Sequence, residues 1–240
     1  GTVTNCAFSG SVSGSKSVGG VVGDNGGTVE NCYNTGKVIG SSVGGVVGDN
    51  HSSGNVTGCY FLKTTGVNES LQGIGNGSGT SSNVEARTDD AFHSGEVAWL
   101  LENGQAEDQT TPVWGQNIKD GKKDNYPQLR AFDADTPQVY KVAFMNDSEE
   151  HVAKYANSGM TVDLPATEPT KEGYTFAGWF TESSGGSQWN FSTAVTKNMT
   201  LYAQWTAVEE PIPTPTPDPT PSGPSTGDST GWDDILDELE

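Results

Sequence analysis

The sequence predicts a mainly β protein that begins with a short β-solenoid of three strands per turn. Three observations predict it. A segment of about 26 residues recurs in the first third, its Val-rich runs are separated by Gly, and fewer than one residue in five is Val, Leu, Ile or Phe. So little aliphatic material excludes one large core spread along the chain, and several small units in series are expected instead.

The repeats are expected to occupy residues 1–80. GTVTNCAFSGSVSGSKSVGGVVGDN is followed by GTVENCYNTGKVIGSSVGGVVGDN, and a third, decayed copy starts at Gly54. Each copy has three short β-type segments, around Val3, Val12 and Val21–Val22 in the first. Gly disfavours helix by about 1 kcal/mol, and one copy is too poor in apolar residues to form a core alone, so the copies should stack as coils. The third copy lacks the Gly-Gly pair, which leaves its register open, and the sequence does not fix the hand of the solenoid.

Three cysteines share one repeat position. Stacked coils would place Cys6, Cys32 and Cys59 in a column at about the inter-strand spacing of 4.8 Å. We expect a structural column of small buried side chains. A disulfide between adjacent coils with one free thiol, and a metal site, are the alternatives.

Two acidic residues also recur at one corner of the solenoid. Asp24 and Asp49 lie beside Asn25 and Asn50. We expect turns with amide ladders here, and Ca²⁺ binding by the stacked oxygens is the alternative.

GGVVGDN occurs twice with NCYNTGKVIG between the copies. This pattern resembles the GLUG motif of bacterial surface proteins, including some immunoglobulin A-specific metallopeptidases. The resemblance covers about residues 1–76 and implies a surface-exposed solenoid. The zinc motif of those enzymes is absent here, so protease activity is not implied.

Residues 81–136 are expected to form a partly helical cap on the end of the solenoid, where strand edges and core would otherwise be open. Helix starts are expected at Thr88 and Ser94, with a stop at Gly104. The apolar stripe between them consists of Phe92, Val97, Leu100 and Leu101. An independent small domain is the alternative.

An aromatic module is expected over residues 137–206. Strands are predicted at Val139–Phe144, Tyr174–Phe180 and Leu201–Trp205, with a turn at Asn157-Ser158-Gly159. EGYTFAGWFTESSGG and the later WNFSTAVTKNMTLYAQW resemble the Listeria–Bacteroides repeat, also called the internalin-type B repeat, over about residues 139–205. The resemblance implies a small β-grasp-like α+β module of secreted and wall-attached proteins, a spacer or adhesion role, and no catalytic residues.

Three tryptophans of this module are the candidate ligand surface. Trp179, Trp189 and Trp205 could form a glycan-binding platform. The expectation that we favour is that they form the core of a small domain with few aliphatic side chains.

The tail, residues 207–240, is expected to be a disordered, acidic linker. PIPTPTPDPTPSGPSTGDSTG is typical of an extended polyproline-type spacer. GWDDILDELE, residues 231–240, predicts a short amphipathic helix. Its apolar face consists of Trp232, Ile235, Leu236 and Leu239. It is a candidate docking helix for a basic-rimmed groove, or the first turns of a further element.

No active site is expected. His51, His93 and His151 have no metal-ligand spacing to another His or Cys, and the Gly73–Gly79 run lacks the strand-to-helix context of a phosphate loop, so it is expected to be a plain loop. We therefore assign no catalytic, cofactor-binding or metal-ligating residue, and we expect neither an enzyme nor a cofactor in this fragment.

The charge restricts the partners. The chain has 31 acidic and 12 basic residues, a formal net charge of -19, which excludes nucleic acid. No run approaches the roughly 18 apolar residues of a membrane-spanning helix. The chain has no starting Met, and we expect a monomeric fragment or processed piece of a longer protein.

The predicted function is that of a non-catalytic segment of a bacterial surface protein, extracellular or attached to the cell surface or wall. It would act as a spacer or presentation module, with a role in adhesion. A glycan- or protein-binding module in its own right, or an accessory region of a surface hydrolase or metallopeptidase, are the alternatives. The surface ligand is unknown.

Overall fold

A computed structural model describes residues 1–64, 66–105, 110–118 and 126–209. Gly1–Ala207 form one compact unit. The candidate docking helix of residues 231–240 lies outside the described residues, as does the Pro-rich segment from residue 210. Within the described residues the protein is mainly β, with two short helices, which confirms the predicted fold class.

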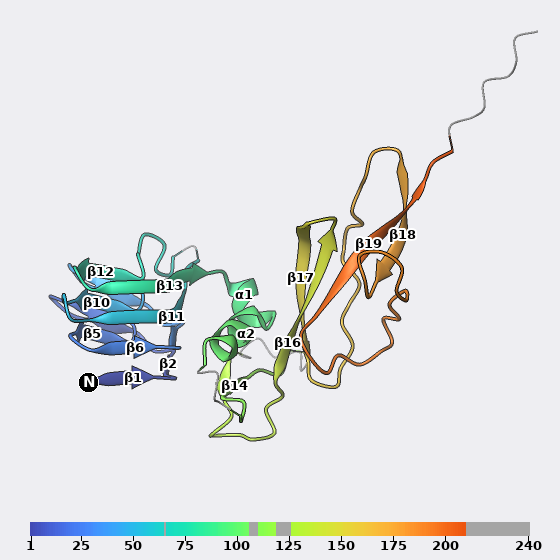
Figure 1. Cartoon of the computed structure of the whole chain (residues 1–240). Helices are drawn as coiled ribbons and strands as arrows, with labels where there is room; N and C mark the ends of the chain where they lie inside the picture. The colour runs from blue at the N-terminus through green and yellow to red at the C-terminus, as the bar shows by residue number, and fades with distance from the viewer. Residues whose placement is uncertain (65, 106–109, 119–125, 210–240) are drawn as a thin grey trace, which may run out of the picture. The chain divides into compact units, whose positions relative to one another are not determined.

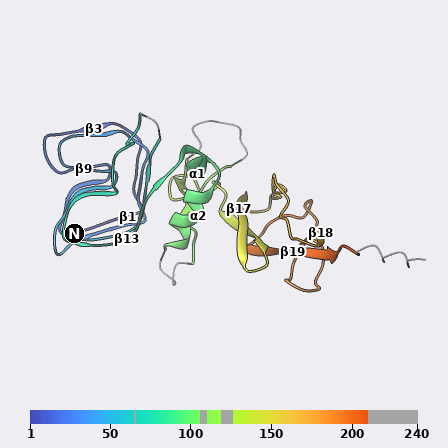
Figure 2. The same cartoon turned by 90° about the horizontal axis from the view of Figure 1, so that it is seen from above.

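Stacked coils form the first part of the chain (Figures 1 and 2). The strands of the first coil are β1 (Thr2–Thr4), β2 (Ala7–Phe8), β3 (Val12–Ser13), β4 (Val18–Gly19) and β5 (Val22–Asn25). Those of the second are β6 (Thr28–Glu30), β7 (Tyr33–Asn34), β8 (Val38–Ile39), β9 (Val43–Gly44) and β10 (Val47–Asn50). Then follow β11 (Asn55–Leu62), β12 (Ile74–Gly77) and β13 (Thr80–Arg87). All pair in parallel, so equivalent repeat positions stack directly.

The longest sheet bends at one residue in each coil. Asn5, Asn31, Gly58 and Asn83 have φ values between 51° and 60°, the left-handed region that Asn and Gly enter at least cost. In the second and third coils the side chain after the bend points inward. Cys32, Cys59, Val29 and Val56 are fully buried in the solenoid core.

Two parts of the solenoid differ from the expectation. The Gly73–Gly79 run, expected to be a loop, contains β12, which pairs with β10 through Val47 and Ile74 and so fixes the register of the third copy. β13 lies in the segment expected to be the cap, yet it pairs with β11 along its length. Its residues are mainly exposed, and a polar strand is a suitable cover for the open edge of β11.

Among the described residues of the third coil no strand lies beside β8, and the side chain of Asn68 takes its place. Its Oδ1 accepts from the amide of Val38 at 3.0 Å, and its Nδ2 donates to the carbonyls of Gly36 and Leu62 at 2.9 and 3.1 Å. A primary amide carries the same donor and acceptor as a peptide group. The buried Asn68 therefore completes the ladder that the decayed repeat leaves open.

The cap begins with two helices, α1 (Asp89–His93) and α2 (Glu96–Asn103). Thr88 caps α1 by accepting from the amide of Ala91, and Gly104 ends α2, as predicted. Gly95, with φ of 95°, separates the helices.

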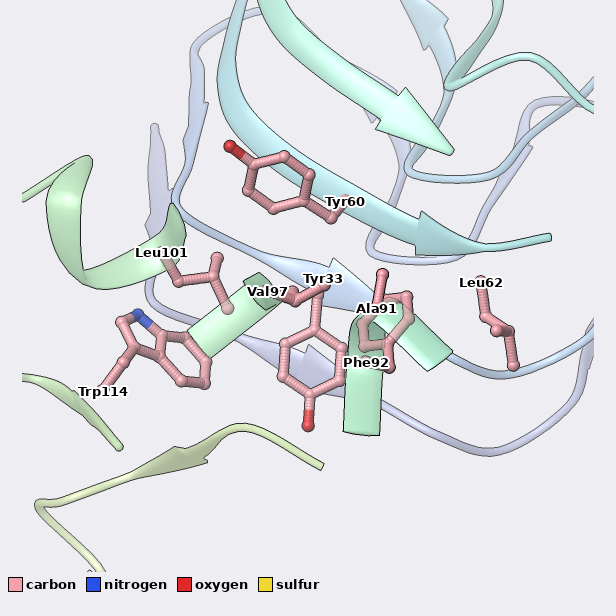
Figure 3. Close-up of a cluster of buried hydrophobic side chains, with 8 residues drawn as sticks. All are labelled: Tyr33, Tyr60, Leu62, Ala91, Phe92, Val97, Leu101 and Trp114. Atoms are coloured by element: carbon pink, nitrogen blue, oxygen red, sulfur yellow. The ribbon is translucent and has the colours of Figure 1, made fainter. Parts of the chain in front are cut away.

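The cap covers the outer side of the solenoid, whereas the sequence predicts it over the end. The side chains of Cys59 and Phe61 point inward. In a strand the neighbouring side chains must then point outward. Tyr60 and Leu62 therefore leave the solenoid core and join Tyr33 in a second cluster with Phe92 of α1 and Leu101 of α2 (Figure 3). The cap is thus a flank support, and β13 covers the end of the sheet.

A two-stranded ribbon, β14 (Trp114–Gly115) and β15 (Gln128–Leu129), completes the cap. Glu102 of α2 holds the start of the ribbon, because its Oε2 accepts from the amides of Val113 and Trp114 at 3.0 and 2.8 Å. Trp114 is fully buried in the cluster of Figure 3.

The aromatic module is a four-stranded mixed sheet in the order β17-β16-β19-β18 (Figure 1). Its strands are β16 (Val139–Asn146), β17 (Glu149–Asn157), β18 (Tyr174–Phe180) and β19 (Met199–Ala207). The order, with β16 parallel to β19, suits the β-grasp-like expectation. Residues 137–207 contain strands, turns and irregular segments but no helix, so the α+β character implied by the resemblance is corrected. Pro165, Pro169 and the run of Ser and Gly at 183–187 prevent helices between these strands.

Candidate binding surfaces

The three candidate tryptophans lie on the core side of the module. Trp179 is 2% exposed and packs edge-on against Phe144 and Phe176, at centroid distances of 4.9 and 5.3 Å. Trp189 and Trp205 are half-buried against the same cluster. Their indole nitrogens are buried without a hydrogen-bond partner among the described residues. The geometry thus places the three rings in or against one core, and it gives Trp179 no exposed face for a ligand.

An irregularity in β18 decides which aromatic rings face out. Its register against β19 shifts between Phe176 and Gly178. Phe176 and Trp179 therefore lie on the same side of the sheet, although strict alternation would separate them. Phe180 pairs with Tyr202 and lies on the opposite side, away from the core.

The opposite side is an open sheet face, defined here by Ala143, Met145, Phe180, Thr200 and Tyr202. The pairs Phe180–Tyr202 and Met145–Tyr202 form one row across three strands, and Ala143–Thr200 form the next row. All five side chains are half-buried. A solvated sheet face ordinarily carries polar residues, so four apolar or aromatic positions out of five indicate a contact surface.

A loop borders one end of the open sheet face. Gln204, next on the same side of β19, donates from Nε2 to the carbonyls of Glu182 and Gly185 at 3.0 and 2.6 Å. Thr181 closes the same loop by donating from its amide to the Ser187 carbonyl at 3.0 Å. These bonds hold the 182–187 loop beside Phe180.

The cap occupies the other end. Trp99 of α2 lies 6.1 Å from the ring of Tyr155, and the ammonium of Lys141 lies 5.3 Å from the Trp99 ring centroid. The indole Nε1 donates to Oδ1 of Asn198 at 2.9 Å, and that oxygen also accepts from the amide of Lys141 at 2.8 Å. Lys141 and Tyr155 pair across β16 and β17, so the Trp99 contact adjoins the open sheet face.

A second set of bonds joins cap and module through a buried amide. Asn157, 4% exposed, accepts at Oδ1 from the amide of Ile118 at 2.9 Å and donates from Nδ2 to the Gln116 carbonyl. Gln116 in turn donates from Nε2 to the Phe92 carbonyl at 2.7 Å. Beside this seam is a cleft of about 400 Å³. It is lined by Ser94, Glu96, Ile118, Val152, Ala153, Lys154, Tyr155 and Asp163.

The cysteine column is present, and all three thiols are free. Cys32 and Cys59 are fully buried, whereas Cys6 is exposed. The amide of Cys6 donates to Sγ of Cys32 at 3.4 Å. The hydrogen bond to the Cys59 thiol, together with burial, raises the pKa of Cys32, and partial burial raises the pKa of Cys6. The expectation of buried side chains therefore holds at Cys32 and Cys59 and is corrected at Cys6, which is exposed.

The repeated Asp-Asn corner is built from amides. Asn25 donates from Nδ2 to Oδ1 of Asn50 at 2.8 Å, and both side chains are buried. Asp24 contacts the His51 ring, and Asp49 accepts from the Asn76 amide at 3.4 Å. The amide ladder is therefore confirmed, and each carboxylate has a protein partner.

Residues 1–64, 66–105, 110–118 and 126–209 contain no group of three or more His, Cys, Asp or Glu side chains placed to hold a metal ion. No helix in these ranges combines the length and the apolar character that crossing a bilayer requires.

Comparison with known families confirms both resemblances. The GLUG motif matches residues 14–39, and the Listeria-Bacteroides repeat domain matches residues 140–204. Both describe repeats, and neither is a catalytic family.

Three curated relatives share short segments with the chain. Internalin H of Listeria monocytogenes is 49% identical over 47 residues, 19% of this chain and 9% of its own. Two proteins of Evansella cellulosilytica, named "Putative membrane protein" and "Putative Gly-rich membrane protein", are 41% and 34% identical over 69 and 68 residues. Each segment is 28% of this chain and 10% or 8% of the relative. The chain thus spans a tenth or less of the length of these relatives.

Proposed function

We propose that the chain is a non-catalytic segment of a bacterial surface protein. It holds its repeat modules at a fixed distance from one another and presents them for adhesion. The GLUG motif, the Listeria-Bacteroides repeat and the internalin relative support a place at the cell surface. In this proposal the segment itself performs no catalysis. An accessory role beside a hydrolase or metallopeptidase would place the catalytic domain in another part of a longer protein.

The observation that carries the proposal is the double attachment of the cap. Toward the solenoid, the Tyr33 hydroxyl donates to the Pro127 carbonyl at 2.7 Å, and the indole of Trp114 donates to Asn5 at 3.1 Å. Toward the module, Asn157 and Trp99 make the bonds described above. A spacer needs such joints, because a module on a loose linker would not keep a fixed distance.

Backbone ¹⁵N relaxation on the full chain tests the proposal. A rigid spacer gives one rotational correlation time for amides in the solenoid, in the cap and in the module. The double variant Trp99→Ala, Asn157→Ala should give the module a shorter time than the solenoid. Different times in the unaltered chain would overturn the spacer function.

A second candidate, a binding module in its own right, is favoured by the open sheet face. Its apolar and aromatic side chains are half-exposed at positions where a sheet ordinarily carries polar residues.

A further inference from the structure

We propose that the open sheet face, Ala143, Met145, Phe180, Thr200 and Tyr202, binds an uncharged glycan chain. The proposal rests on the second candidate function and names its ligand class. It does not depend on the spacer function, which concerns the joints of the cap.

The pairing of three strands provides a row of adjacent side chains. Met145, Tyr202 and Phe180 lie side by side on β16, β19 and β18. Three strands at about 4.8 Å separation give a row about 10 Å long. The 182–187 loop borders the row at one end, held by Gln204. A row of side chains bordered by a loop at one end suits an extended chain lying across the strands better than a compact ligand, which needs an enclosed pocket.

The charge of the face selects an uncharged ligand. The five residues carry no charge, and the nearest ion pair, Lys141 with Glu150 at 2.8 Å, is neutral as a pair. The whole chain has a net charge of -19, so anionic glycans and nucleic acids are repelled over distances up to the Debye length of about 8 Å. The row itself contains no carboxylate for a basic peptide to bind.

The functional groups match a sugar. The rings of Phe180 and Tyr202 offer flat apolar surface to the C–H face of a pyranose, while the hydroxyls of Tyr202 and Thr200 offer hydrogen bonds to its edge. A contact that combines ring packing with a hydrogen bond already lies beside the face. Trp99 packs on Tyr155 while its indole nitrogen bonds the Asn198 amide. The proposed surface is continuous with that interface.

The test is a titration of the ¹⁵N-labelled full chain with laminarihexaose, cellohexaose, xylohexaose and mannohexaose, followed by amide shifts. At least one neutral hexasaccharide should shift the amides of β16, β18 and β19 around Met145, Phe180 and Tyr202. Tyr202→Ala and Phe180→Ala should each weaken that binding on the order of tenfold, which corresponds to about 1.4 kcal/mol. Both side chains lie outside the core cluster, so the variants should stay folded.

Tyr174→Ala is the matched control. Tyr174 is an aromatic residue of the same strand, 46% exposed, but it lies at the far end of β18 beside Lys171. Binding should change less than about twofold. Equal loss in all three variants, or shifts confined to Trp189 and Trp205, would overturn the assignment of the face.

The alternative occupant is a second copy of the chain. Sedimentation equilibrium distinguishes it, because self-association abolished by Phe180→Ala, with no hexasaccharide binding, would overturn the glycan proposal while leaving the module a binding module. If the chain shows no hexasaccharide binding and no self-association, both the glycan proposal and the second candidate function are overturned. The relaxation measurement on the spacer would be unaffected by either result.

Discussion

Oδ1 of Asn198 accepts from the indole nitrogen of Trp99 at 2.9 Å and from the backbone amide of Lys141 at 2.8 Å. One amide oxygen thereby ties the cap helix α2 to two strands of the module. Because Asn198 directly precedes β19, the bond acts at the point where the module's last strand begins.

Asn198→Ala should loosen this joint. Two donors lose one acceptor, and because the site is exposed to water the loss should be about 1 kcal/mol. Asn198→Asp keeps an acceptor oxygen and should stay within about 0.5 kcal/mol of the unaltered chain. Urea unfolding followed by tryptophan fluorescence measures both. Equal losses in the two variants would contradict a role for this oxygen.

Asn68→Ala should destabilise the solenoid more strongly. The change leaves the Val38 amide and the Leu62 carbonyl without the side-chain partner that serves them in a buried position, whereas the Gly36 carbonyl keeps a second donor, Nδ2 of Asn34. Unsatisfied buried polar groups cost about 1–3 kcal/mol.

The matched control is Asn76→Ala. Asn76 is another asparagine of the third coil, but it is exposed and makes a bond of 3.4 Å. It should cost less than about 0.5 kcal/mol. Urea midpoints from far-ultraviolet circular dichroism decide the comparison, and similar midpoints for both variants would contradict the ladder role of Asn68.

The repeats could be predicted because identical residues must stack, and the register of Val3, Val29 and Val56 follows directly from the sequence. β13 could have been found in the same way, since GTSSN at 79–83 follows the pattern of GTVTN at 1–5. Its polar residues hid it, because a terminal strand has no further coil to bury it.

The positions of the cap and of the open sheet face could not be predicted, because both depend on the direction in which individual side chains point. Tyr60 follows the inward-pointing Cys59 and so points out, which places the cap on the flank. The register shift at Phe176 cannot be read from alternation, which would put Phe176 on the same side as Phe180 and on the opposite side from Trp179. β17 was missed because an edge strand needs few apolar residues, and its first three residues are Glu149, Glu150 and His151.

The thiols should differ in reactivity. Cys6 is exposed, while Cys32 and Cys59 are fully buried, so 5,5′-dithiobis(2-nitrobenzoate) at pH 8 should titrate one thiol in the folded chain and three in urea. The raised pKa of Cys6 should make that one reaction slower than with a free thiol. Cys6→Ser should abolish the reaction of the folded chain. If one thiol of the folded Cys6→Ser variant still reacts fast, the first coil opens in solution.

Alkaline pH should weaken the flank of the solenoid through Tyr60. Burial raises its pKa to about 12, against the opposing effect of the Arg87 guanidinium 5.2 Å from its ring centroid. The unfolded chain has the ordinary pKa of about 10. Because the folded pKa is the higher one, this contribution to stability is complete below pH 10 and is lost as the pH rises from about 10 to 12. The loss should approach about 1.4 kcal/mol per pH unit for this one proton.

Tyr60→Phe isolates the effect. It keeps the ring between the cap and the solenoid and removes only the titrating hydroxyl. Urea unfolding between pH 9 and 11 should show a shallower decline of the unfolding free energy in Tyr60→Phe than in the unaltered chain. Tyr33 and Tyr155, whose pKa values are also raised mainly by burial, contribute equally in both proteins and cancel in the difference. Identical slopes would mean that Tyr60 is not held between the two layers in solution.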